Sequence, residues 1–154
     1  MAESVWDYPR PPRVEPAGRR IRVVLDRRTI ADTTAACRVL ETSHPPVYYV
    51  PRTDVSAGLT PSARRGSLCE WKGAARYWDV SVGGRVVEGA AWGYPDPSPG
   101  YEALRDTLAF YPALMDECWV DEERATPQPG GFYGGWVTSD LIGPFKGGPG
   151  TSGW

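Results

Sequence analysis

Proline and glycine divide this chain into short pieces, and that division limits the secondary structure it can form. The 154 residues include 16 prolines and 18 glycines, which interrupt helices and favour turns. Between them, apolar and polar residues mostly alternate with a period of two, as in half-buried strands. In residues 20–26, for example, Ile21, Val23 and Leu25 share one face. The sequence therefore predicts a mainly β protein.

The strongest local signal is a hairpin. Residues 75–82 and 85–92 flank a Gly-Gly pair at 83–84, and glycine tolerates the positive φ angles of a tight two-residue turn. An uninterrupted register from that turn places Tyr77 opposite Ala90. Further strands are predicted at residues 35–41, 47–50 and 117–121.

One segment carries helical spacing. Tyr101, Leu104, Leu108 and Tyr111 recur at intervals of three or four until Pro112, which predicts one short amphipathic helix near residues 100–111. The segment 127–154 is rich in glycine and proline, but its aromatic and aliphatic content is too high for a solvated linker. We therefore expect a single domain, 1–154, with residues 1–18 and 137–154 as extended arms packed on it.

Charge and the length of the apolar runs argue against two kinds of partner, nucleic acids and membranes. Seventeen basic and nineteen acidic residues give a net charge of -2, without a basic stripe to neutralise a nucleic-acid backbone. No run of about 20 apolar residues is present to span a membrane. These features predict a soluble, cytoplasmic protein that binds neither nucleic acid nor membrane, and they leave monomer and dimer open.

The cysteines and the histidine argue against a metal cofactor. The three cysteines are widely spaced, and the chain has one histidine, His44. Neither a disulfide framework nor the closely paired ligands of a structural zinc site follows from this pattern. We expect reduced thiols, no metal and no cofactor. Cys69, with Lys72 nearby, fits either an activated thiol or a buried structural cysteine.

Several longer motifs resemble a known family. They comprise residues 3–12, 30–33 and 39–49, Trp71-Lys72-Gly73, residues 128–130 and Tyr133-Gly134-Gly135-Trp136. In this order they resemble the bacterial family called domain of unknown function 427, nearly end to end. The tail 136–154 resembles an actinobacterial form of that family.

The resemblance implies a fold. Members are described as β-tents, in which two antiparallel sheets pack across a cleft, similar to the ligand-binding domain of cereblon and to methionine sulfoxide reductase B. Relatives that bind zinc use two pairs of closely spaced cysteines, which this sequence does not contain. The family is also labelled nucleotidyltransferase-like, but the sequence carries no phosphate-loop pattern for such a reaction.

The expected site combines rings with a few charges. Aromatic residues beside proline or glycine either fill the ends of a small core or line a pocket. Glu41 shares a strand face with Cys37 and Val39, so we expect it to point inward, either in a strand-end ion pair or toward a ligand. The residues expected to bind a ligand are Trp6, Tyr8, Arg10, Glu41, Asp54, Trp71, Lys72, Tyr77, Trp92, Tyr133 and Trp136. No catalytic residue is assigned.

Three functions remain open at this point. The first is binding of a small organic ligand in an aromatic-lined cleft between the sheets. The second is an enzyme that uses the same cleft. The third is a protein-interaction module that presents the proline-rich segment 8–12 to another domain.

Overall fold

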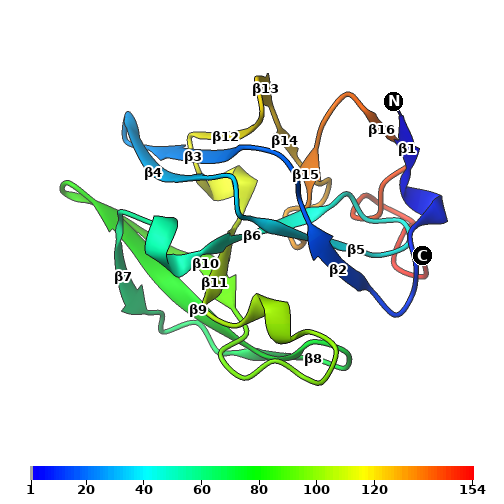
Figure 1. The fold of residues 1–154 in the computed structure, drawn as a ribbon, viewed down its shortest axis with the longest axis horizontal. Coiled ribbons are helices and arrows are strands. Elements are labelled where there is room, and N and C mark those ends of the chain that lie inside the picture. Colours follow the sequence, from blue (N-terminus) through cyan, green and yellow to red (C-terminus); the bar gives the residue numbers. More distant parts are fainter. Residues whose placement is uncertain (1) are drawn as a thin grey trace.

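The computed structural model describes residues 2–154, so that residue 1 of the predicted arm 1–18 lies outside them. They form mainly β structure with a large and a small antiparallel sheet (Figure 1), which confirms the predicted class. The large sheet has eight strands. Their spatial order is β2 (Arg13–Pro16), β5 (Cys37–Leu40), β6 (Val47–Pro51), β11 (Thr107–Phe110), β10 (Arg85–Gly93), β9 (Gly73–Val82) and β7 (Gly58–Pro61), and β8 (Ser67–Cys69) also pairs with β9.

The remaining strands form one four-stranded sheet and two short pairs. The small sheet has the order β13 (Glu123–Arg124), β12 (Glu117–Val120), β3 (Ile21–Leu25) and β4 (Arg28–Thr33). The pairs are β1 (Glu3–Ser4) with β16 (Leu141–Ile142), and β14 (Thr126–Pro127) with β15 (Trp136–Val137). Four single-turn 3-10 helices complete the described residues: η1 (Val5–Asp7), η2 (Arg52–Asp54), η3 (Glu102–Leu104) and η4 (Pro112–Leu114). Within residues 2–154, no helix has the length and apolarity that crossing a membrane requires.

The helix predicted near residues 100–111 is shorter than the spacing indicated. Only Glu102–Leu104 is helical, as the 3-10 helix η3, and Thr107–Phe110 forms strand β11. Asp106 adopts a φ of 57°, which ends the helical turn. Both faces of β11 are covered, because Leu108 and Phe110 pack in the core between the sheets and Ala109 packs in the aromatic cluster on the opposite face. A strand covered on both faces is apolar along its whole length. An apolar run this short is compatible with both the helical period and the strand period of two.

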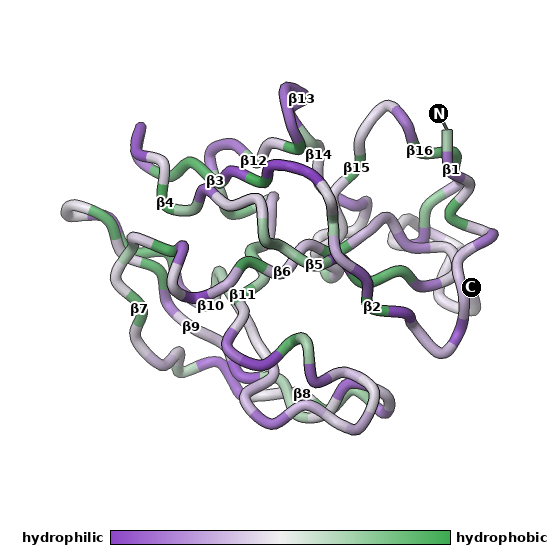
Figure 2. Tube along the Cα trace, in the orientation of Figure 1, coloured by the Kyte–Doolittle hydropathy of each residue, from purple (hydrophilic) through white to green (hydrophobic). Residues whose placement is uncertain are grey.

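A hydrophobic core fills the space between the two sheets. Side chains of the small sheet, such as Ile21 and Val23, pack against Val50, Val80 and Phe110 of the large sheet. Hydrophobic residues recur along β3, β4, β9 and β10, whereas the β3–β4 turn is hydrophilic (Figure 2). Along the central strands β6, β11 and β9, alternate side chains enter this core and their neighbours point to the opposite face.

The β9–β10 hairpin contains a bulge that the predicted register lacks. Val80 pairs with Val87 as expected, but Tyr77 then pairs with Trp92 and not with Ala90. The extra residues of β10 include Gly89, whose φ is 60° and whose N–H donates to the Asp79 carboxylate at 2.8 Å. A glycine with positive φ inside a strand is characteristic of a bulge. Because of the bulge, the β9 partner of Trp92 is two residues closer to the turn than it would be in an uninterrupted ladder.

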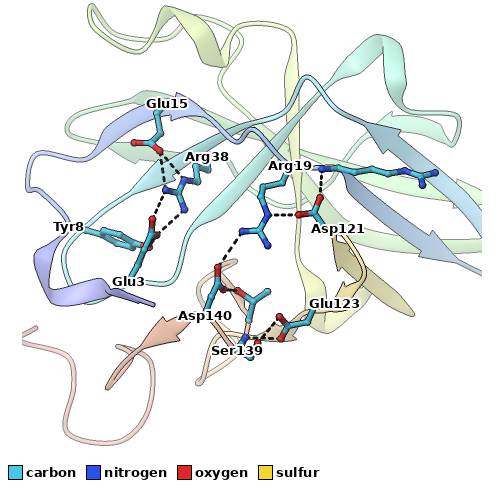
Figure 3. A network of polar contacts seen from close by, with 11 residues as sticks. Glu3, Tyr8, Glu15, Arg19, Arg38, Asp121, Glu123, Ser139 and Asp140 are labelled. Atoms are coloured by element: carbon cyan, nitrogen blue, oxygen red, sulfur yellow. Dashed lines mark hydrogen bonds and ion pairs between the residues drawn. The ribbon is translucent and has the colours of Figure 1, made fainter. Parts of the chain in front are cut away.

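An arginine of β5 joins the N-terminal arm to the large sheet (Figure 3). The Arg38 guanidinium donates to both carboxylate oxygens of Glu3 at 3.1 Å and to Glu15 at 3.0 Å. The Tyr8 hydroxyl donates to Glu3 as well, at 2.7 Å. Hydrogen bonds from Arg38 lower the pKa of Glu3 against the opposing effect of its partial burial. Charge-assisted, bidentate contacts of this kind fix the arm in one geometry.

A second group of contacts holds the later segment 138–142. Arg19 donates to Asp121 at 2.6 Å and to Asp140 at 3.3 Å, so it links the small sheet with the segment that precedes β16. The Ser139 N–H and hydroxyl both donate to Glu123. The two arms then meet in the parallel β1–β16 pair.

Candidate functional site

A pocket of about 580 Å³ opens on the face of the large sheet that points away from the small sheet. On β6, Tyr48 and Val50 enter the core between the sheets, while Val47 and Tyr49 line the pocket. The same alternation on β9 and β10 directs Tyr77 and Trp92 into it. The cleft was predicted between the sheets, but that space holds the hydrophobic core, and the pocket lies on the opposite face.

Aromatic rings form most of its wall. Trp92 lies at the centre, with ring centroids 4.4 Å from Tyr111 and 6.2 Å from Tyr49, and Tyr94 lies 6.3 Å from Tyr49. All four residues are buried, although each lines the pocket. Tyr77 adds a fifth ring, whose hydroxyl lies 3.0 Å from the Ser67 hydroxyl. Rings in contact at these distances hold one another in place and present a preformed apolar surface.

Three of the buried polar side chains, His44, Lys72 and Gln128, converge on this pocket. A somewhat larger hollow of about 690 Å³ lies elsewhere, lined by Arg52, Arg105 and several alanines and prolines. None of the buried polar side chains lines it. Because ligand sites combine apolar walls with a few convergent polar groups, the aromatic pocket is the stronger candidate.

Lys72 brings an uncompensated charge into the pocket. The residue is only 9% exposed, and its Nζ lies 5.7 Å from the Tyr94 ring centroid. No carboxylate of residues 2–154 lies within 4.0 Å of that ammonium. The backbone is fixed on both sides, because the Lys72 carbonyl accepts the Ser98 N–H at 2.9 Å and its N–H points to Cys69 Sγ at 3.5 Å.

Gln128 sets the tautomer of His44. Its Oε1 accepts the Gly135 N–H at 3.1 Å and its Nε2 donates to the Lys146 carbonyl at 2.8 Å, which fixes the orientation of the amide. The second Nε2 proton then points to His44 Nδ1 at 3.0 Å. An amide nitrogen only donates, so Nδ1 accepts and the imidazole proton resides on Nε2. That N–H points toward Glu41 Oε2, which is 3.6 Å away and outside hydrogen-bond range.

His44 is neutral at physiological pH. Its pKa is lowered to about 4, mainly by burial; Glu41 opposes this shift, and the positive charges of Lys146, Arg10 and Lys72 reinforce it. Glu41 is itself partnered by Arg10, with Nη2 and Oε2 3.4 Å apart. Neutral His44 therefore presents a hydrogen-bond donor to the pocket and not a second positive charge.

We expect this histidine to make the protein less stable in mild acid. An unfolded histidine has a pKa near 6.5, so between that value and about 4 the unfolded state binds more protons, and stability falls as pH falls. The expected loss from pH 7 to pH 5 is about 2 kcal/mol. Urea unfolding at both pH values measures it.

The matched control is His44→Gln, which cannot titrate in this range. Its stability is expected to change far less between pH 7 and pH 5 than that of the unmodified protein. An equal loss in the two proteins would show that other groups cause the acid sensitivity.

Glycines bring the last wall of the pocket close to the rings. A Cβ on Gly134 would overlap the Trp92 indole, and one on Gly135 would overlap Pro45 and the Gln128 amide. The chain therefore lies directly on the ring, as only glycine permits. At the rim, Leu68 and Phe132 come from opposite segments and remain 80% and 69% exposed.

The structure brings together part of the predicted site. Glu41, Trp71, Lys72, Tyr77, Trp92 and Tyr133 line the pocket, and Arg10 joins it through Glu41. The others lie elsewhere: Trp6 donates to the Pro144 carbonyl, Tyr8 to Glu3, Asp54 ends η2, and Trp136 is buried between the sheets.

Several pocket residues were not among the expected binders. They are Tyr49, Arg64, Tyr94, Tyr111, His44, Gln128 and Lys146. His44 and Gln128 are 84 positions apart, and neither has a sequence pattern that marks the contact. One available signal was that both lysines of the chain flank aromatic or glycine-rich motifs.

The pocket offers aromatic rings and hydrogen-bonding groups to a ligand. Among the described residues 2–154, no three side chains of His, Cys, Asp or Glu are grouped to hold a metal ion. The cysteines are free, and burial raises the pKa of Cys37 and Cys118.

A known protein family matches most of the chain. The model of a protein family described as Domain of unknown function (DUF427) matches residues 13–121. A search of curated proteins gave no match. The matched range includes the strands of the large sheet and Lys72, but it ends before Gln128 and Lys146.

Proposed function

Since the chain belongs to the DUF427 family, a domain of unknown function, we propose from the site itself that the protein binds a small organic ligand in the aromatic pocket. One observation carries the proposal. The pocket of about 580 Å³ joins preformed ring surfaces to the ammonium of the buried Lys72, which has no carboxylate partner among residues 2–154. Its volume lies within the range of about 300–1,000 Å³ typical of small-molecule sites.

Native mass spectrometry of the purified protein tests the proposal, together with a thermal-shift screen of common metabolites. We expect a small molecule to be retained, or a compound to raise the melting temperature. A ligand present at about 100 times its dissociation constant stabilises by about 2.7 kcal/mol. If nothing is retained and no compound shifts the transition, the proposal fails.

A blocking variant places the effect in the pocket. Ser67 is exposed at its mouth, so Ser67→Trp is expected to fill part of it and weaken binding at least about tenfold. Thr60→Trp is the matched control, because Thr60 is exposed on the edge strand β7 and does not line the pocket. Equal weakening by both variants would place the ligand elsewhere.

A further inference from the structure

The charges around the aromatic pocket are unbalanced. Both lysines of the chain line it, and Arg64 adds a third cation. Two carboxylates face them, but Glu41 pairs with Arg10 from outside the wall, and Glu70 is exposed at the mouth. Arg64 is exposed like Glu70, and the Lys146 ammonium donates to the Trp154 carbonyl at 3.2 Å, so the buried charge of the pocket is the Lys72 ammonium.

Lys72 differs from Arg38, a partly buried cation of the large sheet. Arg38, whose side chain is 15% exposed, has two carboxylate partners, Glu3 and Glu15. The more buried Lys72 has only a ring face at 5.7 Å within the described part of the chain. Burial of a charge without a partner is costly. An anion supplied by a ligand would restore the balance.

A second donor lies in the same pocket without a partner. His44 Nε2 carries the imidazole proton because Gln128 occupies Nδ1. Its nearest carboxylate, on Glu41, is 3.6 Å away, and Nε2 makes no hydrogen bond to residues 2–154. A neutral N–H recognises an oxygen without adding charge, so it suits a group already held by Lys72.

The ring faces argue against a cationic ligand. Aromatic pockets bind cations when open ring faces surround them. Here Arg64 lies 3.8 Å over Tyr77 and 5.5 Å over Tyr111, and Lys72 lies over Tyr94. The protein's own cations therefore already occupy these faces, and a positive ligand would be repelled.

We propose that the ligand is a small organic anion with a planar apolar body, whose carboxylate or phosphate oxygens pair with the Lys72 ammonium while its body packs against the Trp92 ring. This inference rests on the proposed function and adds the chemical class of the ligand. It also gives Lys72 a role in specificity, because an uncharged ligand of the same shape would leave the ammonium unpaired.

Four naphthalene derivatives test this class directly. They are 1-naphthoate, 1-naphthyl phosphate, 1-naphthamide and 1-naphthylmethylammonium, and isothermal titration calorimetry measures their affinities. We expect at least one of the two anions to bind about tenfold or more tightly than the amide, and the ammonium compound to bind most weakly. The ratio between the two anions distinguishes carboxylate from phosphate recognition.

Three variants connect the preference to one side chain. Lys72→Met keeps the apolar stem and is expected to abolish the preference for the anion, whereas Lys72→Arg keeps the charge and retains it. Arg76→Met removes an equal charge from an exposed position over Trp78, outside the pocket, and is expected to change nothing.

The outcomes separate this inference from the proposed function. If the amide binds the unmodified protein as tightly as both anions, or if Lys72→Met keeps the preference, the anion inference is overturned while ligand binding stands. Failure of all four compounds at millimolar concentration also overturns it, and the retained molecule sought by native mass spectrometry still decides the proposed function.

Discussion

Replacement of Trp136 by alanine is expected to lower the free energy of unfolding by about 4 kcal/mol. Trp136 is 1% exposed and heads the fully buried side chains of the fold by volume. Its ring lies 5.1 Å from Tyr48, and its Nε1–H donates to the Phe110 carbonyl at 3.4 Å. The substitution removes the ring from the core between the sheets and leaves that carbonyl without its donor.

Urea unfolding followed by circular dichroism measures the loss, and Trp6→Ala provides the control. Trp6 is 41% exposed and contacts Trp154 and the Pro144 carbonyl, so its removal is expected to cost about 1 kcal/mol. Similar losses for both tryptophans would contradict the assignment of Trp136 to the core.

The second large effect is expected at Gly147. Its φ is 133°, a value that residues with a side chain rarely adopt, and a Cβ there would overlap the Pro129 carbonyl. Gly147→Ala is therefore expected to lower the unfolding free energy by about 3 kcal/mol, through backbone strain and displacement of the crossing chains. Gln128 and Lys146 adjoin this crossing, so binding in the pocket is expected to weaken too.

The adjacent glycine supplies a strict comparison. A Cβ on Gly148 would meet nothing within 4 Å, and its φ is not in the left-handed range. Gly148→Ala is expected to change stability by less than about 0.5 kcal/mol. Both variants are compared by urea unfolding, and a Gly147→Ala protein as stable as Gly148→Ala would rule out the close crossing.

The strands with a clean period of two were predictable from sequence. The predicted segments 20–26, 47–50 and 117–121 correspond to β3, β6 and β12. Strand β11 was not, because its apolar residues satisfy a helical and an extended period equally well. Its pairing with β6 and β10 makes this segment a strand, and that pairing depends on the tertiary structure.

The pairing of Trp92 was missed for a local reason. A two-residue turn fixes the register only as far as the ladder is continuous, and the bulge at Gly89 interrupts it. Glycine inside a strand was the visible signal. The Asp79 carboxylate that accepts the Gly89 N–H is ten positions away along the chain.

The site could be predicted only in part, because side chains from distant segments of the chain meet there. Trp71, Lys72, Tyr77 and Trp92 come from the hairpin and its approach, and local reasoning found them. The wall that closes the pocket comes from residues 128–134 and Lys146. Their approach depends on glycine–backbone contacts between distant segments, which spacing in the sequence does not encode.

The positions of the lysines have a practical consequence for covalent chemistry. Because the remaining basic residues are arginines, both ε-amino groups of the chain line a single cavity. An acylating reagent or an aldehyde will therefore find its side-chain amines there, apart from any free α-amino group. Protection of Lys72 from such a reagent becomes a direct reading of occupancy, and an acetyl group on it would cancel the charge that faces the rings.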